Sequence, residues 1–156
     1  MSAADPQLIA DRVVAHMLKA DAFSRWLGIT VSGVAPGRVT CRMTVRDEMV
    51  NGFGTSHGGI VYSLADSAFA FATNNCGRLS VAVDTVMSYP AVVRPGDVLT
   101  AFAEQESASR ALAFCSVTVR NQRDIVVGHF RGTVYRLKSD HIPELGNTLG
   151  LPGSPE

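Results

Sequence analysis

The sequence predicts a single α+β domain in which one long helix lies on an antiparallel β-sheet. First, residues 58–75 have a helical pattern with almost no formal charge, so other parts of the protein must cover this helix. Second, the segments after residue 77 are rich in Val, Phe, Thr and Tyr and are separated by turn signals, which is typical of strands. Third, 156 residues without a repeat or a linker make one domain. One sheet carrying one central helix is the simplest solution.

Each expected element rests on capping residues, periodicity or turn signals. Asp5-Pro6 opens a helix, because Asp is a good N-cap and the first helical position does not need the N–H that proline lacks. Pro90 cannot donate to a β-ladder, so it should mark a strand end or a bulge. Apolar residues alternate within residues 111–120, as in a strand covered on one face. In chain order we expect a helix at about 5–20, a helical turn at 23–27, strands at 28–34 and 39–45, a loop at 47–57, a helix at 58–75, and strands at 80–89, 98–105, 111–120 and 125–136, with turns at 35–37, 94–97, 107–109 and 121–124.

The domain is expected to span residues 1–141, with its core at about 28–137. Residues 142–156 have three prolines and three glycines and little apolar periodicity, so we expect a flexible tail. The most apolar stretch, residues 58–72, is too short and too polar to cross a bilayer, and the N-terminus does not resemble a signal peptide.

The composition also limits the partners. The chain has 14 basic and 14 acidic residues, and this balance lacks the basic excess that nucleic-acid binding requires. Cys41, Cys76 and Cys115 show no metal-ligand spacing and are expected to be reduced, buried thiols. The sequence therefore predicts a cytoplasmic protein that binds neither nucleic acid nor membrane.

One carboxylate and one helix start carry the candidate chemistry. Asp66 is the only formal charge between Gly58 and Asn75, and burying a carboxylate is costly unless it has a partner or a function. The structural alternative is that Asp66 caps a group or faces an opening. His57-Gly58-Gly59 begins the helix, where free N–H groups and a partial positive charge would suit a developing oxyanion. The alternative for the two glycines is a plain tight turn.

The distance between these groups predicts a dimer. Asp66 lies eight residues beyond Gly58, which corresponds to about 12 Å along a helix axis. An aspartate side chain cannot span that distance. If both groups are catalytic, two antiparallel copies of the helix must share the site across a two-fold axis.

The block Asn51-Gly52-x-Gly54-Thr55-x-His57-Gly58-Gly59, followed by Ser63-Leu64-Ala65-Asp66-x-Ala68-Phe69-Ala70, resembles the phenylacetic-acid-degradation thioesterases of the hot-dog superfamily. The resemblance continues through Tyr89, residues 94–97 and residues 129–136, and covers about residues 40–137. It implies a hot-dog fold, in which an antiparallel sheet wraps around one long helix, here with an extra N-terminal helix. It also implies a dimer of dimers that hydrolyses small aryl- or arylacetyl-CoA thioesters without a cofactor.

The same resemblance suggests roles for individual residues. Asp66 corresponds to the nucleophile or general base, and the Gly58 N–H corresponds to the donor for the thioester carbonyl. His57 and Asn51 correspond to residues that order the loop and assist near the thioester. The three arginines among the substrate contacts expected from this resemblance could instead be ordinary solvated surface residues. The two aromatic residues of the helix, Tyr62 and Phe69, could instead pack in the core. The expected substrate contacts are Gly59, Tyr62, Ser63, Phe69, Tyr89, Arg94, Arg110 and Arg136.

Other interpretations remain open. Gly54-Thr55-Ser56-His57-Gly58 matches the G-x-S-x-G pattern of serine hydrolases, but a polar loop precedes it instead of a strand. A metal site from His57, Asp66 and His129 lacks the usual ligand spacing. An enoyl-CoA hydratase or dehydratase is the nearest enzymatic alternative, and a non-catalytic acyl-CoA-binding module is the alternative outside enzymes.

Overall fold

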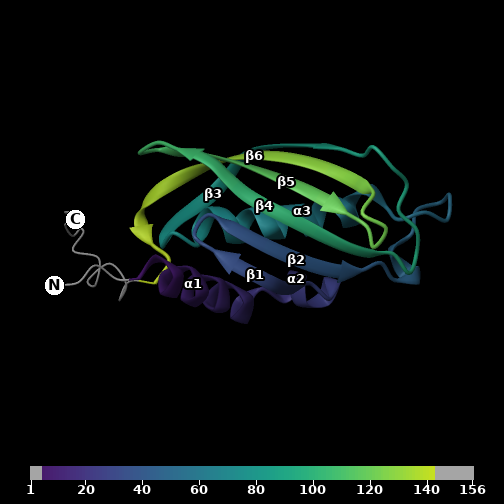
Figure 1. The fold of residues 1–156 in the computed structure, drawn as a ribbon, viewed down its shortest axis with the longest axis horizontal. Coiled ribbons are helices and arrows are strands. Elements are labelled where there is room, and N and C mark those ends of the chain that lie inside the picture. The colour runs from purple at the N-terminus through teal and green to yellow at the C-terminus, as the bar shows by residue number, and fades with distance from the viewer. Residues whose placement is uncertain (1–4, 143–156) are drawn as a thin grey trace.

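The computed structural model describes residues 5–142, and Figure 1 shows their arrangement as one sheet with helices on one side. The Asp5 carboxylate accepts a hydrogen bond from the Gln7 N–H at 3.0 Å, which confirms the predicted N-cap of the first helix. Residues 143–156 of the expected tail lie outside the described residues. In chain order the elements are α1 (Pro6–Ala20), α2 (Ala22–Leu27), β1 (Thr30–Ala35), β2 (Arg38–Thr44), the 3₁₀ turn η1 (Asp47–Met49), α3 (Gly58–Asn74), β3 (Arg78–Ser88), β4 (Val98–Ala108), β5 (Leu112–Arg120) and β6 (Val126–Asp140).

The six strands form one antiparallel sheet in the order β1-β2-β4-β5-β6-β3. The last strand, β6, inserts between β5 and β3, and it pairs with β3 from Ser80↔Arg136 to Ser88↔His129. β1 and β3 are therefore the two edges of the sheet (Figure 1).

Helix α3 lies on the inner face of the sheet and contacts β2, β3, β4, β5 and β6. Phe69 packs over Gly132 of β6, where a built Cβ would lie 2.6 Å from the Phe69 ring, so the missing side chain makes room for that ring. The opposite side of α3 stays uncovered in the single chain. At helical spacing this open side carries Gly59, Ser63, Asp66 and Ala70, which are exposed or only partly buried.

Two asparagines fix the end of α3. The Asn75 side chain donates to the Ala35 carbonyl and accepts from the Gly37 N–H, both at 2.8 Å. The Asn74 side chain accepts the Ser80 N–H at 2.8 Å. These amides tie the helix end to the β1–β2 turn and to the start of β3.

The structure corrects two strand ends. The sequence predicted a turn at 107–109, but β4 continues to Ala108, because its pairing with β5 resumes after a bulge between Gln105 and Ser107. Strand β6 runs to Asp140, past the expected end at Arg136, because it pairs with β3 as far as Arg78↔Asp140. β3 ends at Ser88, just before Pro90, as predicted.

The expectation of three buried thiols is wrong for one cysteine. Cys41 and Cys115 are buried, whereas Cys76 is exposed. Cys76 follows the end of α3, where Asn75 takes the buried position.

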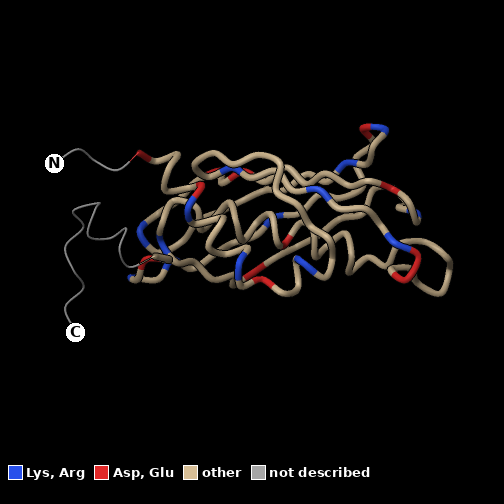
Figure 2. Tube along the Cα trace, turned by 90° about the horizontal axis from the view of Figure 1, so that it is seen from below, with Lys and Arg blue, Asp and Glu red and all other residues tan. Residues whose placement is uncertain are grey.

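Acidic and basic residues are both scattered over the described part of the trace, as Figure 2 shows. Among the described residues, none of the helices has the length and apolar character needed to cross a membrane.

Candidate active site

The N-terminus of α3 carries a backbone donor that the described part of the chain leaves unused. His57 is the N-cap, and its Nδ1 accepts a hydrogen bond from the Gly59 N–H at 2.9 Å. The Ile60 N–H donates to the His57 carbonyl, also at 2.9 Å. No acceptor among residues 5–142 takes the Gly58 N–H. Of the two expected glycines, Gly58 therefore has the donor that is free for a ligand, at the positive end of the helix dipole.

Asn51 orders the loop that leads into α3. Its Oδ1 accepts hydrogen bonds from the Phe53 N–H at 2.9 Å and the Thr55 N–H at 3.3 Å, and its Nδ2 donates to Thr55 Oγ1 at 3.0 Å. Gly54 has φ +73°, a left-handed conformation that favours glycine. The loop is thus held by its own hydrogen bonds, and it positions the helix start.

Asp66 lies on the open side of α3 and is partly buried. Within the described residues no side chain or backbone group donates a hydrogen bond to its carboxylate or forms an ion pair with it. Burial raises the pKa of the Asp66 carboxyl above its ordinary value, because desolvation disfavours the charged form. The helical rise from Gly58 to Asp66 is about 12 Å, so one chain cannot bring both groups to one carbonyl.

Two tyrosine side chains connect α3 to β3 and to the residue that follows it. The Tyr89 ring comes within 3.4 Å of the position that a Cβ on Gly58 would take, so a side chain at 58 would crowd it. The Tyr62 hydroxyl forms a 2.5 Å hydrogen bond with Thr85 Oγ1 of β3. Burial, together with nearby Tyr62, raises the pKa of the Tyr89 phenol. Nothing in the sequence marked Thr85, since its contact depends on β3 lying beside the helix.

The remaining helical candidates have structural contacts. Ser63 Oγ donates to the Gly59 carbonyl at 2.7 Å, one turn back along the helix. Phe69 is 1% exposed, and its ring packs 5.3 Å from that of Phe130. Phe69 is therefore a core residue in the single chain, which is the alternative that the sequence left open.

The three candidate arginines do not gather in one place. Arg94 is exposed on the loop between β3 and β4. Its backbone N–H donates a hydrogen bond to the Asp97 carboxylate at 2.8 Å. The Arg136 guanidinium donates to the Ser109 carbonyl at 2.8 Å and so holds the β4–β5 turn, on which Arg110 is exposed. Arg136 pairs with Ser80. Ser80 is near the start of β3, and Tyr89 follows its far end. At about 3.3 Å per residue, Arg136 is therefore roughly 30 Å from Tyr89 and from the start of α3.

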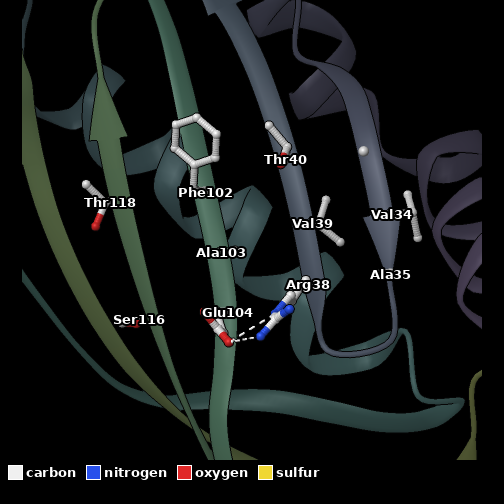
Figure 3. A pocket seen from close by; sticks show the side chains of 11 residues that line it. Val34, Ala35, Arg38, Val39, Thr40, Phe102, Ala103, Glu104, Ser116 and Thr118 are labelled. Atoms are coloured by element: carbon white, nitrogen blue, oxygen red, sulfur yellow. Dashed lines mark hydrogen bonds and ion pairs between the residues drawn. The ribbon is translucent and has the colours of Figure 1, made fainter. Parts of the chain in front are cut away.

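A hollow of about 690 Å³ lies on the other face of the sheet. Thr40, Phe102 and Thr118 line it from β2, β4 and β5, and they alternate with the residues that face α3 (Figure 3). An exposed ion pair between Arg38 and Glu104 lies at its rim. None of the expected site residues lines this hollow, so it is separate from the candidate site.

The structure does not favour the serine-hydrolase and metal-site interpretations. Ser56 is only 9% exposed, its hydroxyl donates to the His57 carbonyl at 3.3 Å, and the preceding residues form a loop instead of a strand. Among the described residues, no three His, Cys, Asp or Glu side chains come together as metal ligands.

Comparisons with known proteins identify the family. Residues 53–127, which include His57, Gly58 and Asp66, match the model of the thioesterase superfamily. A putative esterase of Archaeoglobus fulgidus is 31% identical over 142 residues, covering 91% of this chain and 92% of the relative. Acyl-coenzyme A thioesterase PaaI of Escherichia coli is 34% identical over 121 residues, covering 78% of this chain and 86% of the relative.

Solved structures agree with this assignment. The structure of the E. coli PaaI protein from the phenylacetic acid degradation operon matches with a TM-score of 0.85 at 31% identity, over 87% of this chain and 99% of that one. The TT0310 protein of Thermus thermophilus matches with a TM-score of 0.72 at 39% identity, over 75% of this chain and 98% of that one. The chain therefore belongs to the thioesterase superfamily, and it is a thioester hydrolase with the hot-dog fold.

Proposed function

We propose that the protein is an acyl-CoA thioesterase that hydrolyses small aromatic thioesters, of the phenylacetyl or hydroxyphenylacetyl type, in sites shared between two chains. The central observation is the separation of two unused groups on one helix. Gly58 offers a free N–H and Asp66 a carboxylate without a partner among residues 5–142, about 12 Å apart along α3. Each group is incomplete alone, and together they are what hydrolysis of a thioester needs.

The chemistry follows from these two groups. The Gly58 N–H of one chain donates to the thioester carbonyl, and with the helix dipole it stabilises the negative charge that develops on that oxygen. Asp66 of the second chain either attacks the carbonyl carbon to form a mixed anhydride or removes a proton from an attacking water. The C–S bond breaks, and the CoA sulfur leaves and takes a proton. In the first route a water then hydrolyses the anhydride and regenerates Asp66, whereas in the second the water oxygen bonds directly to the acyl carbon. The products are the free acid and CoA.

Two uncovered surfaces support the dimer. The outer edge of β3 has no partner strand in the single chain, and its side chains Val81, Val83 and Val86 are 45%, 58% and 50% exposed. An unpaired apolar edge strand favours pairing with another strand. A two-fold axis at this edge would also bring the open sides of two α3 helices together in antiparallel orientation, with Gly58 of each near Asp66 of the other. Two such dimers would make the expected tetramer.

The substrate class is the finer part of the proposal. Tyr62 and Tyr89 lie near the helix start and would border the place where the thioester carbonyl binds. The E. coli relative comes from the phenylacetic acid degradation operon, which supports the same class for this chain. Arg94 is exposed near the helix start and would meet the CoA phosphates, whereas Arg110 and Arg136 lie too far from it to reach the same substrate within one chain. We place the reaction in the cytoplasm.

Thiol release from phenylacetyl-CoA, measured with a thiol-reactive dye, tests the activity. The assay should use a Cys76→Ser background, because Cys76 is exposed and would itself react. We expect Asp66→Asn to lower kcat at least about a hundredfold, while Asp11→Asn, an exposed change on α1, leaves it unaltered. Full activity in Asp66→Asn would refute the role of this carboxylate. Loss of enone absorbance from an enoyl-CoA without thiol release would instead indicate a hydratase.

The role of the Gly58 N–H has an equally direct test. Gly58 is the first residue of α3, a position where proline is well tolerated, so Gly58→Pro removes the N–H with little cost to the helix. Gly58→Ala adds the same Cβ next to Tyr89 but keeps the donor. We expect a loss of about a hundredfold in kcat for the proline variant and a small loss for the alanine variant. Equal losses would show that crowding, and not the donor, is responsible.

Hybrid dimers test the shared site. After subunit exchange, half of the dimers formed from Asp66→Asn and Gly58→Pro chains are hybrids, and each hybrid holds one intact site out of two. The mixture should therefore recover about a quarter of the wild-type activity. No recovery despite demonstrated exchange would mean that each site lies within one chain.

A further inference from the structure

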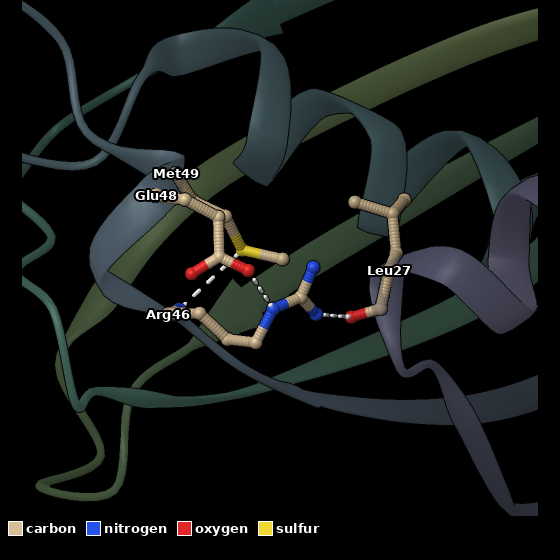
Figure 4. Close-up of polar contacts among 4 residues, drawn as sticks. All are labelled: Leu27, Arg46, Glu48 and Met49. Carbon is tan, nitrogen blue, oxygen red and sulfur yellow. Dashed lines mark hydrogen bonds and ion pairs between the residues drawn. The ribbon is translucent and has the colours of Figure 1, made fainter.

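Two exposed aromatic side chains on α2 have no role so far. Phe23 is 54% and Trp26 is 60% exposed, and their rings stack with centroids 6.0 Å apart and an angle of 25° between the planes. The Arg46 guanidinium lies 5.7 Å from the Trp26 ring. It is itself held by the Leu27 carbonyl at 3.0 Å and by Glu48 at 2.5 Å (Figure 4). The pair is thus ordered, although much of its apolar surface is open.

A buried hydrogen-bond network places this pair beside the candidate site. Ser24, next to Phe23 in the chain, is fully buried, and its hydroxyl lies 2.5 Å from the Asp21 carboxylate and 3.0 Å from the hydroxyl of Ser67. Because an ionised carboxylate only accepts, Ser24 donates to Asp21 and Ser67 donates to Ser24. Ser67 directly follows Asp66. The network therefore fixes α2 against the helical turn that carries the proposed catalytic carboxylate.

The open side of α3 has different neighbours on its two flanks. Toward β3, the hydrogen bond between Tyr62 and Thr85 and the contact of Tyr62 with Phe130 already join the helix to the sheet. Toward α2, Phe23 and Trp26 remain uncovered. Of the two flanks, the one beside α2 therefore has aromatic surface free to receive an acyl group bound near Asp66.

We propose that Phe23 and Trp26 form the surface on which the aromatic ring of the acyl group stacks. This inference rests on the proposed function and names residues that determine its substrate preference. Stacked aromatic side chains bind a further ring more tightly than an aliphatic group of similar size. The adenine of CoA lies at the opposite end of the substrate from the thioester, so it does not compete for a surface beside Asp66.

Kinetics with two substrates test the proposal. Phe23→Leu and Trp26→Leu keep apolar surface but remove the rings, and each should raise KM for phenylacetyl-CoA about five- to tenfold. For acetyl-CoA, which has no ring, the same variants should change kcat/KM less than twofold. Leu8→Ala is the control, since Leu8 is also 54% exposed but lies on α1, and it should alter neither substrate. Equal losses for both substrates, or no loss for either, would overturn the proposal.

Trp26 also reports binding directly, because it is the only tryptophan of the chain. In the inactive Asp66→Asn variant, phenylacetyl-CoA should change the Trp26 emission, and CoA alone should not. An equal change in emission with CoA alone would mean that Phe23 and Trp26 bind the nucleotide. A change in emission when the protein is diluted without ligand would mean that they contact another protein chain. Either result overturns the proposal. Absence of thiol release by the wild type would refute the proposed function itself, whereas release without any effect of the two Leu variants would refute this inference alone.

Discussion

The imidazole of His57 caps helix α3 by accepting the Gly59 N–H at Nδ1, 2.9 Å away. An accepting Nδ1 places the ring proton of the neutral imidazole on Nε2. Ser, Thr, Asp and Asn are the usual caps, so a histidine here combines a structural task with a group that can assist near the thioester. The two tasks can be separated by substitution.

His57→Ala should lower the free energy of unfolding by about 0.5–2 kcal/mol, because the cap is lost, whereas His57→Asn should restore most of it. Denaturant titration of both variants measures this difference. If the imidazole assists the reaction, kcat falls about tenfold or more in both variants. Full kcat in His57→Asn would mean that His57 only caps the helix.

The pH dependence of kcat/KM should report Asp66. The carboxylate must be ionised to act as a base or nucleophile, and burial raises the pKa of Asp66 above 3.8. Activity should therefore rise with pH through an acid limb centred above 3.8. Initial rates between about pH 3.5 and about 8 measure this limb. A limb centred below 3.8 would contradict the assignment.

Asp66 should also reduce stability at neutral pH. Since the pKa of this carboxyl is higher in the folded state than in the unfolded state, the folded protein binds more protons between the two pKa values. Its stability therefore falls as pH rises from 3.8 through the folded pKa and stays lower above it. Asp66→Asn should melt at a higher temperature than wild type at pH 7, and the difference should vanish below pH 3.8. A lower Tm for Asp66→Asn at pH 7 would show that a partner stabilises the charge.

The three thiols should differ sharply in reactivity. Burial raises the pKa of Cys41 and of Cys115 to about 12, so neither forms the reactive thiolate near neutral pH, while Cys76 is exposed. A thiol reagent should modify one cysteine per native chain and all three in guanidinium. Cys76→Ser should abolish the native reaction. Fast modification of a second thiol in that variant would show that the core opens.

Asn75 should contribute strongly to stability. Asn75 is fully buried, and Asn75→Ala would remove the partner of the buried Gly37 N–H and of the partly buried Ala35 carbonyl, at a cost of about 2–4 kcal/mol. Gln7→Ala, which removes a hydrogen bond to the nearby Val34 carbonyl from a partly buried side chain, should cost about 1 kcal/mol or less. If denaturant titrations gave the same loss in free energy of unfolding for both variants, burial would not determine how much these hydrogen bonds stabilise the protein.

Local chemistry made much of the fold predictable. The cap at Asp5, the strand end before Pro90 and the start of α3 at Gly58 each depend on residues within a few positions, and the structure confirms them. The lone charge of Asp66 was visible in the sequence in the same way, and so was its separation of about 12 Å from the helix start, since a helix has a fixed rise of about 1.5 Å per residue.

Contacts between distant segments were decided by the tertiary structure. Periodicity shows which face of a strand is buried but not which strands are neighbours, so the insertion of β6 beside β3 could not be predicted. The same limit hid the contact of Tyr89 with Gly58 and the bond between Ser24 and Ser67, which join residues more than thirty positions apart. The sequence alone determined which groups can do chemistry, because that depends on residue type and helical rise. Only the fold decided what surrounds them, because strand order and packing depend on the whole chain.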